Sequence, residues 1–366
     1  MRIGVITFHC SYNFGSALQA VALKSLLDKL GHQSMVIDYR GRDFEKYRLL
    51  PTYSKRALLD SVLHFSRNRK RAEAFESFMS GHMDLTRRFS WHDEGKLDEL
   101  QGDFDCFVCG SDQIWNLDCT DGPVGPYFLS FAGDRRRVAY APSIAHTHFR
   151  DGVFGLAQRE GVAGWLSRFY AISVREAATV SLFQPLVDRP ISVCLDPTLM
   201  LDRDDYEPML EGAGDIGDPS SSLFVYMLER NDALVSYADG MAQELGCGIQ
   251  YVSAQRLPFR SPSRNLYGVG PAEFLALVAR SRAVVTNSFH ATVFSLLFDR
   301  PFRTLATRES GSRMVELLEN LGLSSHLTDG TEAPEVFAPG GDRVARGLEP
   351  LRESSLAFLE NALGEA

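Results

Sequence analysis

Short apolar segments alternate with helical segments along most of this chain, and this alternation limits the fold more than any other feature. The pattern predicts strands at residues 2–8, 33–39, 104–109, 137–142, 169–174, 191–195, 222–228, 248–253, 282–286 and 301–306. It predicts helices at 15–30, 55–65, 68–80, 153–166, 175–184, 232–246, 271–280, 290–298, 311–321 and 346–363. Because strands joined through helices run parallel, we expect an α/β protein with parallel sheets covered on both faces.

The length of 366 residues predicts two domains, because a single hydrophobic core stops growing at a smaller size. The stretch 200–222, rich in Asp, Gly, Ser and Pro, is expected to be a linker or surface loop. We therefore predict two Rossmann-like, doubly wound domains, at 1–200 and 201–345, that face each other across a cleft. We expect the ligand-binding site at the carboxyl ends of the strands in these domains. The last helix, 346–366, is a candidate to pack back on the first domain.

Charge is unevenly distributed along the chain. Residues 1–150 contain 20 Lys and Arg and 18 Asp and Glu, whereas the remainder contains 18 and 29. The net charge of -9 argues against a general nucleic-acid-binding protein. The basic runs 67–71 and 135–137 are interpreted first as solvated surfaces. The alternative is contact with substrate phosphates or with anionic lipid head groups, which would hold the protein at the inner face of a membrane.

Several sequence features predict a cytoplasmic protein without a metal site. Residues 1–7 form an apolar run that is too short for a secretory signal, and no stretch approaches the length of a membrane span. The six cysteines are expected to be reduced, and Cys106 and Cys109 are expected on opposite faces of one strand. His146 and His148 lack a third ligand at a suitable spacing for a metal.

The most informative turn joins the predicted strand 282–286 to the predicted helix 290–298. Asn287 or Ser288 can cap this helix, and the free N–H groups of a helix N-terminus bind anions. His290 falls in the first helical turn, from which it can reach a bound anion. The alternative is a capped helix that carries a surface histidine.

Arg175 occupies a similar position at the end of the predicted strand 169–174. Its planar guanidinium suits a carboxylate or a phosphate. The alternative is an ion pair with Glu176 or with a nearby aspartate. Asp196, which follows another predicted strand, is interpreted as a side chain that ties its loop to backbone N–H groups.

Two polar loops of the first domain complete the candidate site. They are residues 11–16, after the first strand, and residues 110–116, after strand 104–109. Amide, hydroxyl and carboxylate groups around Trp115 are typical of a sugar site, in which the indole covers the ring; ordinary turn chemistry is the alternative. The loop 11–16 lacks the G-x-G-x-x-G spacing of a dinucleotide site. The motifs G-x-x-x-x-G-K-[ST], H-E-x-x-H and G-x-S-x-G are absent from the sequence, which removes the motif evidence for several other enzyme classes.

Five motifs, in order, resemble those of the polysaccharide pyruvyl transferase family. They are residues 13–20, 110–116, 173–176, 195–198 and 286–295, followed by closing motifs at 311–313 and 321–323. The resemblance covers residues 1 to about 323, with Ala291 where many members have glycine. It implies a two-domain fold like that of the GT-B glycosyltransferases. It also implies transfer of a carboxyvinyl unit from phosphoenolpyruvate to two hydroxyls of a sugar, which gives a pyruvate ketal and phosphate.

The resemblance also implies roles for individual residues. Arg175 would bind phosphoenolpyruvate, and His290 would be catalytic. Donor binding would also involve Asn287, Ser288 and Arg313. The acceptor sugar would contact Asn13, Gly15, Ser16, Ser111, Asp112, Gln113, Trp115 and Asn116. Glu229, after strand 222–228, is a candidate second acid.

The partners implied are phosphoenolpyruvate, as a co-substrate, and an acceptor sugar carried on a nucleotide, a lipid or a polymer. No metal and no cofactor are expected. Two other functions remain open at this point. One is a nucleotide-sugar glycosyltransferase of the same fold, and the other is a non-catalytic scaffold for polysaccharide assembly. The sequence carries no signal for an oligomeric state.

Overall fold

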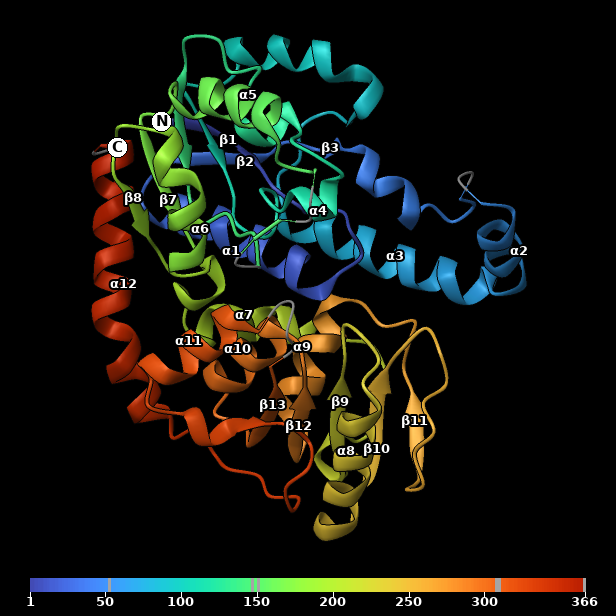
Figure 1. The fold of residues 1–366 in the computed structure, drawn as a ribbon. Helices are drawn as coiled ribbons and strands as arrows, with labels where there is room; N and C mark the ends of the chain where they lie inside the picture. Colours follow the sequence, from blue (N-terminus) through green and yellow to red (C-terminus); the bar gives the residue numbers. More distant parts are fainter. Residues whose placement is uncertain (52–53, 146–147, 150–151, 307–310, 365–366) are drawn as a thin grey trace. The chain divides into compact units, whose positions relative to one another are not determined.

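Two six-stranded parallel sheets form the centres of two separate units (Figure 1). The computed structural model describes residues 1–51, 54–145, 148–149, 152–306 and 311–364. The first unit comprises Met1–Phe65, Phe75–Met200 and Leu351–Ala366. The second unit comprises Ser66–Ala74 and Leu201–Pro350. A short segment from the N-terminal half of the chain thus belongs to the second unit, and the last residues belong to the first.

The sheet of the first unit has the order β2-β1-β5-β6-β7-β8, with parallel neighbours throughout. Its strands are β1 (Arg2–Ile6), β2 (Gln33–Val36), β5 (Cys106–Cys109), β6 (Arg136–Ala139), β7 (Ala171–Val174) and β8 (Ile191–Val193). Every residue of β5 is buried, as expected for a parallel strand between two layers of helices. The strand order reverses between β1 and β5. The loops after these two strands therefore begin at the switch point where doubly wound sheets bind ligands.

The sheet of the second unit has the order β11-β10-β9-β12-β13-β14 and is also parallel. Its strands are β9 (Ser222–Tyr226), β10 (Gly248–Val252), β11 (Ser263–Asn265), β12 (Ala283–Thr286), β13 (Phe302–Leu305) and β14 (Leu327–Thr328). Here the order reverses between β9 and β12. The predicted α/β class with two doubly wound domains is therefore confirmed.

The helices follow the strands in the expected alternation. They are α1 (Phe14–Lys29), α2 (Lys55–Leu63), α3 (Phe65–His82), α4 (Leu117–Thr120), α5 (Leu156–Leu166), α6 (Ala177–Phe183), α7 (Arg203–Glu211), α8 (Asp232–Leu245), α9 (Pro271–Arg280), α10 (Phe289–Leu297), α11 (Ser312–Asn320) and α12 (Gly341–Leu363). Short 3₁₀ helices span Arg42–Tyr47, Trp91–Gly102, Gly125–Phe128, Gln184–Leu186, Pro197–Leu199, Pro219–Ser221 and Ser324–His326. A separate two-stranded sheet pairs β3 (Tyr39–Arg40) with β4 (Phe89–Ser90).

All ten predicted strands and all ten predicted helices are present, mostly with shorter bounds. One expectation is wrong in part, because the supposed linker 200–222 contains helix α7. Asp202 caps this helix in a reciprocal pair with Asp205, and Tyr206 and Met209 are buried. The cluster of acidic residues that suggested a loop is thus the N-terminal cap and first turn of a helix, where carboxylates are stabilised.

Gly110 is a backbone position at which any side chain is expected to be damaging. It follows β5 with a φ of 122°, and a Cβ atom there would lie 2.0 Å from the carbonyl oxygen of Tyr140. We expect Gly110→Ala to lower the free energy of unfolding of the first unit by about 1–3 kcal/mol, because β6 must move to remove the overlap. The control is Gly161→Ala in α5, where a Cβ meets nothing within 4 Å. The control should be neutral or slightly stabilising.

Tryptophan fluorescence during urea unfolding can measure this effect in the first unit alone. All three tryptophans of the chain, Trp91, Trp115 and Trp165, lie in that unit. Equal unfolding midpoints for Gly110→Ala and Gly161→Ala would contradict the prediction.

Candidate active site

The turn after β12 is fixed to the segment after β9, at the switch point of the second sheet. The Thr286 hydroxyl donates to the carbonyl oxygen of Tyr226 at 2.6 Å. The Asn287 side chain accepts a hydrogen bond from the Leu228 N–H at 2.8 Å and donates to the carbonyl oxygen of Glu229 at 2.9 Å. The amide oxygen and the amide nitrogen of Asn287 thus both hold the turn in place. The side chain of Glu229, in the segment that follows β9, is exposed.

His290 and Arg313 both contact one aromatic ring. Ser288 caps α10 by accepting from the Ala291 N–H, which places His290 in the first turn of this helix. The Phe289 ring contacts the His290 ring edge to face at 5.2 Å between centroids. The guanidinium carbon of Arg313, from α11, lies 5.0 Å from the centroid of the same phenylalanine. The structure therefore brings together the predicted donor residues of the second unit, with both His290 and Arg313 buried.

Arg175 is held by a buried ion pair in the first unit. Its guanidinium lies 2.7 Å from Asp196 Oδ2, and the two side chains are only 3% and 0% exposed. The same guanidinium nitrogen donates to the Ser111 hydroxyl. Asp196 also accepts from the Thr198 N–H at 2.9 Å, so the aspartate ties its loop, as expected, and balances the arginine charge. Of the two interpretations of Arg175, the ion pair with a nearby aspartate is therefore observed.

Glu176 has a different role from the one weighed in the sequence analysis. Its carboxylate accepts hydrogen bonds from the Ser143 hydroxyl at 2.7 Å and from the N–H groups of Ile144 and Ala145 at 3.1 and 3.0 Å. The side chain is 1% exposed. Glu176 thus organises the loop after β6 and does not neutralise the neighbouring arginine.

The loops after β1 and β5 share one buried polar network. The Ser111 N–H donates to Gln19 Oε1 at 3.1 Å, and the Thr7 hydroxyl donates to the Ser111 carbonyl at 3.1 Å. The Ser16 hydroxyl donates to Asp112 at 2.5 Å. Together with the Arg175 contact, these bonds connect the carboxyl ends of β1, β5, β7 and β8.

The remaining predicted acceptor residues frame these loops. Asn13 caps α1 by accepting from the N–H groups of Gly15 and Ser16. Asn116 caps α4 by accepting from the Asp118 N–H, and its amide donates to the half-buried Gln113. Since Asn116 is 0% exposed, its side chain serves the fold of this loop.

The expectation that Trp115 covers the face of a sugar ring is wrong. Its side chain is fully buried, and its ring stacks on Phe128 at 5.2 Å between centroids. The indole N–H donates to the carbonyl oxygen of Tyr127 at 3.0 Å. Further contacts with Phe169 and Phe183 complete an aromatic core, so the ring is unavailable to a ligand.

Comparison with known proteins gives the family. A family model described as polysaccharide pyruvyl transferase matches residues 13–310. The chain belongs to the polysaccharide pyruvyl transferase family. No curated protein sequence matches the chain. The predicted family is thus confirmed.

Solved structures resemble this pyruvyl transferase family member in fold. The UDP-GlcNAc 2-epimerase from Neisseria meningitidis, bound to UDP-GlcNAc, gives a TM-score of 0.52 at 10% identity and covers 99% of this chain and 94% of that chain. Arabidopsis thaliana UGT89C1, complexed with UDP-L-rhamnose, gives 0.48 at 9% identity and covers 98% of each chain. At 10% identity, the likeness to the epimerase shows the fold alone, and it agrees with the GT-B-like class expected from the sequence.

A second buried network in the first unit was not foreseen. His9 Nδ1 lies 3.2 Å from the carbonyl oxygen of Thr7, and Nε2 lies 3.1 Å from Asp38 Oδ1. Both ring nitrogens of His9 thus face oxygen atoms of the protein. Arg40 and Arg88 also contact Asp38, at 3.0 and 2.9 Å.

This network anchors the loop after β1 to helix α3. Arg40 forms two hydrogen bonds with the carboxylate of Glu76, at 2.8 and 3.1 Å, and the Tyr12 hydroxyl donates to the same group at 3.1 Å. Burial alone would raise the pKa of Asp38, but its interaction with His9, together with the charge of Arg40 and the hydrogen bond from Arg88, holds this pKa well below its usual range. The only sequence signal was the i, i+2 spacing of Asp38 and Arg40, which places them on one side of an extended segment.

Asp38→Asn is expected to lower the free energy of unfolding of the first unit by about 2 kcal/mol near neutral pH, because charge-assisted hydrogen bonds are lost. The folded pKa of Asp38 is below its unfolded value of about 4. The carboxylate therefore stabilises the fold above about pH 4, and this stabilisation disappears as the pH falls through the folded pKa.

The stability difference between Asp38→Asn and the wild type should consequently shrink on acidification. Urea unfolding followed by tryptophan fluorescence, at a series of pH values from neutral to strongly acidic, measures this difference. The exposed Asp98 offers a matched control, since Asp98→Asn should change little at any pH. A difference between Asp38→Asn and the wild type that stays constant with pH would contradict the prediction.

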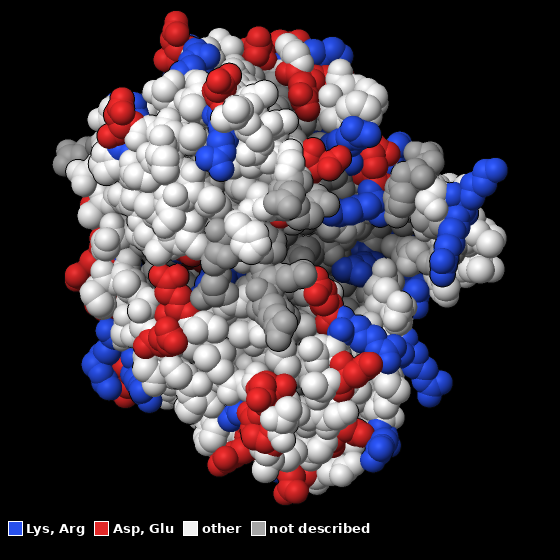
Figure 2. All heavy atoms as spheres, viewed as in Figure 1, with Lys and Arg blue, Asp and Glu red and all other residues white. Residues whose placement is uncertain are grey.

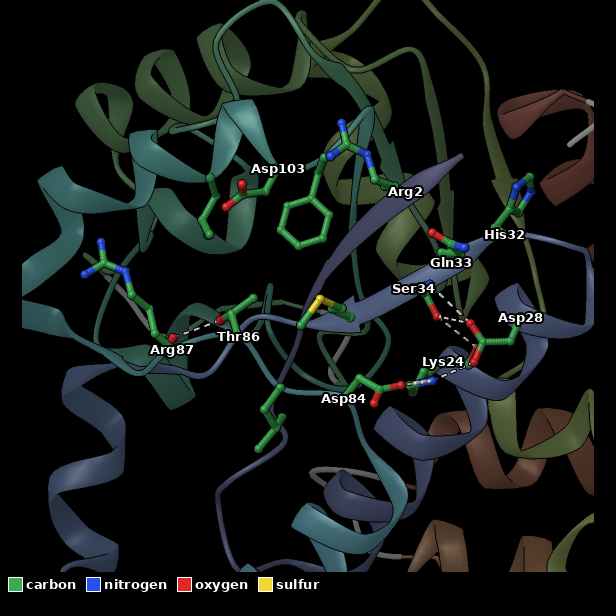
Figure 3. Close-up of a pocket in the computed structure, with 14 residues that line it drawn as sticks. Arg2, Lys24, Asp28, His32, Gln33, Ser34, Asp84, Thr86, Arg87 and Asp103 are labelled. Carbon is green, nitrogen blue, oxygen red and sulfur yellow. Dashed lines mark hydrogen bonds and ion pairs between the residues drawn. The ribbon is translucent and has the colours of Figure 1, made fainter.

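A cavity of about 830 Å³ lies at the amino ends of β1 and β2 (Figure 3). Arg2 and Gln33, at the starts of these strands, contribute to its lining. Lys24 pairs with two acidic residues of the lining, at 2.6 Å from Asp28 and 2.8 Å from Asp84 (Figure 3), and the lining also contains Arg2, Arg87 and Asp103. The local charges are balanced, so this cavity does not match the cationic site expected for a small multiply charged anion.

Two further features bear on cofactors and membranes. Among the described residues, no group of three His, Cys, Asp or Glu side chains is placed to hold a metal ion. His146 and Thr147 of the weighed His-x-His motif lie outside the described residues. Within the described part of the chain, no helix is both long and apolar enough to cross a bilayer.

Proposed function

We propose that this protein transfers a carboxyvinyl group from phosphoenolpyruvate to two hydroxyls of one sugar in a cell-surface glycan or its precursor. The products are a cyclic pyruvate ketal and phosphate. The observation that carries the proposal is the grouping of His290 and Arg313 around Phe289, at the N-terminus of α10, in a member of this family. Phosphoenolpyruvate carries a carboxylate and a phosphate, and such an anion suits an arginine beside a helix N-terminus.

The second unit is assigned to the donor. Arg313 supplies a permanent positive charge, and His290 supplies a hydrogen-bond donor that can also move a proton. Asn287 and Ser288 act by shaping the turn and the helix cap, since their side chains bond to the backbone there. Arg175 remains a proposed donor contact. Because Asp196 already balances its charge, its contribution to the affinity for phosphoenolpyruvate should be smaller than that of Arg313.

The first unit is assigned to the acceptor. Ser16 and Asp112, which share a hydrogen bond after β1 and β5, offer a hydroxyl and a carboxylate at the switch point of the sheet. Such groups bind sugar hydroxyls. Gln113, which is half-buried, and the backbone at Asn13 and Gly15 are the other proposed contacts.

The proposed chemistry begins with protonation of C3 of the enol, which leaves a cationic centre at C2. One sugar hydroxyl adds to C2 and gives up its proton. The bond from C2 to the phosphate oxygen then breaks, and the second hydroxyl closes the ring. One of the two hydroxyl protons balances the proton added at C3, and the other leaves with phosphate. His290 is the proposed proton donor, worth about 10²–10⁴-fold, and Glu229 is a second candidate acid.

The test is phosphate release by the purified protein from phosphoenolpyruvate, measured with a panel of nucleotide-linked, lipid-linked and polymeric sugar acceptors. Mass spectrometry of the acceptor should show the ketal. Thermal unfolding with phosphoenolpyruvate, UDP or GDP provides a separate binding measurement. Stabilisation by phosphoenolpyruvate alone supports the proposal, stabilisation by a nucleoside diphosphate alone favours glycosyl transfer, and no response to any ligand favours a scaffold.

A further inference from the structure

Helix α2 (Lys55–Leu63) carries an exposed apolar face. Leu58, Leu59, Val62 and Leu63 are 40%, 61%, 55% and 71% exposed. Their spacing puts all four on one side of the helix. Leu50 and Phe65, which flank the helix in sequence, are exposed as well. Six of the eleven large exposed apolar side chains of the described chain thus lie between residues 50 and 65, and we call these six the α2 surface.

The orientation of α2 is the reverse of that of an ordinary surface helix. A helix on a soluble domain buries its apolar side chains and exposes its polar ones. Here the leucines are exposed, whereas Ser61 is half-buried. A nine-residue helix is also marginal in water unless an apolar face is packed against something. The α2 surface therefore suits an apolar environment outside the described chain.

The charge around the α2 surface indicates which apolar environment it suits. Residues 50–72 contain the six basic residues Lys55, Arg56, Arg67, Arg69, Lys70 and Arg71, against a single acidic residue, Asp60. Lys and Arg side chains are visible at the α2 end of the molecule in a chain whose net charge is -9 (Figure 2). An exposed apolar face beside concentrated positive charge is the pattern of helices that lie on anionic lipid bilayers.

Some of the basic residues have partners of their own. The guanidinium groups of Arg67 and Arg71 lie over the Tyr267 ring at 4.4 and 4.8 Å, and Arg69 pairs with Glu73 at 2.7 Å. Lys55 and Arg56, in the first turn of α2, are exposed and adjoin the apolar face. These two side chains are the ones best placed to contact lipid phosphates.

We propose that α2 docks on the surface of a membrane that contains anionic phospholipids. The four apolar side chains of α2 enter the boundary between head groups and acyl chains, and Lys55 and Arg56 contact phosphates. This inference concerns location and does not depend on the proposed reaction. It is tested with vesicles that lack any glycan lipid, so its failure and the failure of pyruvyl transfer are distinguishable.

The experiment is co-sedimentation of the full-length protein with vesicles of phosphatidylcholine alone or mixed with phosphatidylglycerol. We expect binding to the mixed vesicles that weakens as salt is added. The double variant Leu59→Ser, Leu63→Ser should bind at least about tenfold more weakly. Lys55→Glu with Arg56→Glu should weaken binding at least about twentyfold, given roughly fivefold for each positive charge lost. The control Leu156→Ser, at a residue that is 81% exposed in α5, should bind like the wild type.

Three outcomes would overturn the proposal. The first is no binding of the wild type to the mixed vesicles at low salt. The second is equal binding of the wild type and the Leu59→Ser, Leu63→Ser variant. The third is a concentration-dependent dimer, seen by analytical ultracentrifugation, that this variant abolishes while vesicle binding stays absent. That result would assign the α2 surface to a second copy of the chain.

Discussion

His290→Ala is expected to lower kcat for phosphoenolpyruvate-dependent ketal formation by about 10²–10⁴-fold, with a much smaller change in KM. The reason is that the imidazole is proposed to deliver the proton to C3, an interaction present only in the transition state. Steady-state phosphate release at saturating acceptor measures both constants. Ser295→Ala is the matched control, because Ser295 lies buried five residues later in the same helix and its hydroxyl donates to the Ala291 carbonyl.

The variant Arg313→Met, measured in the same assay as His290→Ala, separates binding of the negatively charged donor from proton transfer. If Arg313 holds the donor in the ground state, its loss should raise KM for phosphoenolpyruvate more than it lowers kcat. A His290→Ala variant that changes only KM would assign His290 to phosphate binding and leave Glu229 as the acid to test. Activity of His290→Ala equal to that of Ser295→Ala would remove the histidine from the mechanism.

The sequence predicted that the candidate donor residues after β12 lie together, because they are local in the chain. Asn287, Ser288 and His290 lie within one strand-to-helix turn, and their relation follows from the geometry of that turn. Arg313 was supplied by the family resemblance, since it lies on another helix. Phe289, which contacts both His290 and Arg313, was missed because nothing in the sequence distinguishes this apolar helix residue from one that only packs in a core.

The errors in the first unit come from contacts between residues far apart in sequence. Trp115 was interpreted from its polar neighbours in the chain, but its burial is decided by Phe128, Phe169 and Phe183. The same limit applies to the pair of His9 and Asp38, which are far apart in sequence and are joined by Arg88 from the segment before β4. Residue spacing describes one element at a time, whereas such networks depend on which elements meet.

Arg175→Met is expected to lower the free energy of unfolding of the first unit by about 3–5 kcal/mol, because it leaves the fully buried Asp196 carboxylate without its balancing charge. Asp196→Asn should be destabilising for the same reason, although the amide oxygen can still accept from Thr198. The double variant should recover much of the loss, since a buried pair replaced by neutral groups of similar size is often tolerated. Urea unfolding followed by tryptophan fluorescence gives the coupling energy, and simply additive losses would contradict the pairing.

The double variant Arg175→Met, Asp196→Asn also decides whether Arg175 has a second role. A single substitution at Arg175 does not distinguish loss of stability from loss of ligand binding. The guanidinium contacts Ser111 and Asp196, so its removal affects the fold as well as any bound ligand. In the folded double variant this ambiguity is removed. If Arg175 binds phosphoenolpyruvate, half-maximal thermal stabilisation should require about tenfold more of it than in the wild type, the loss of one charge-assisted contact. An unchanged requirement would make Arg175 a structural residue, and the binding of the donor anion would then rest on Arg313 and the N-terminus of α10.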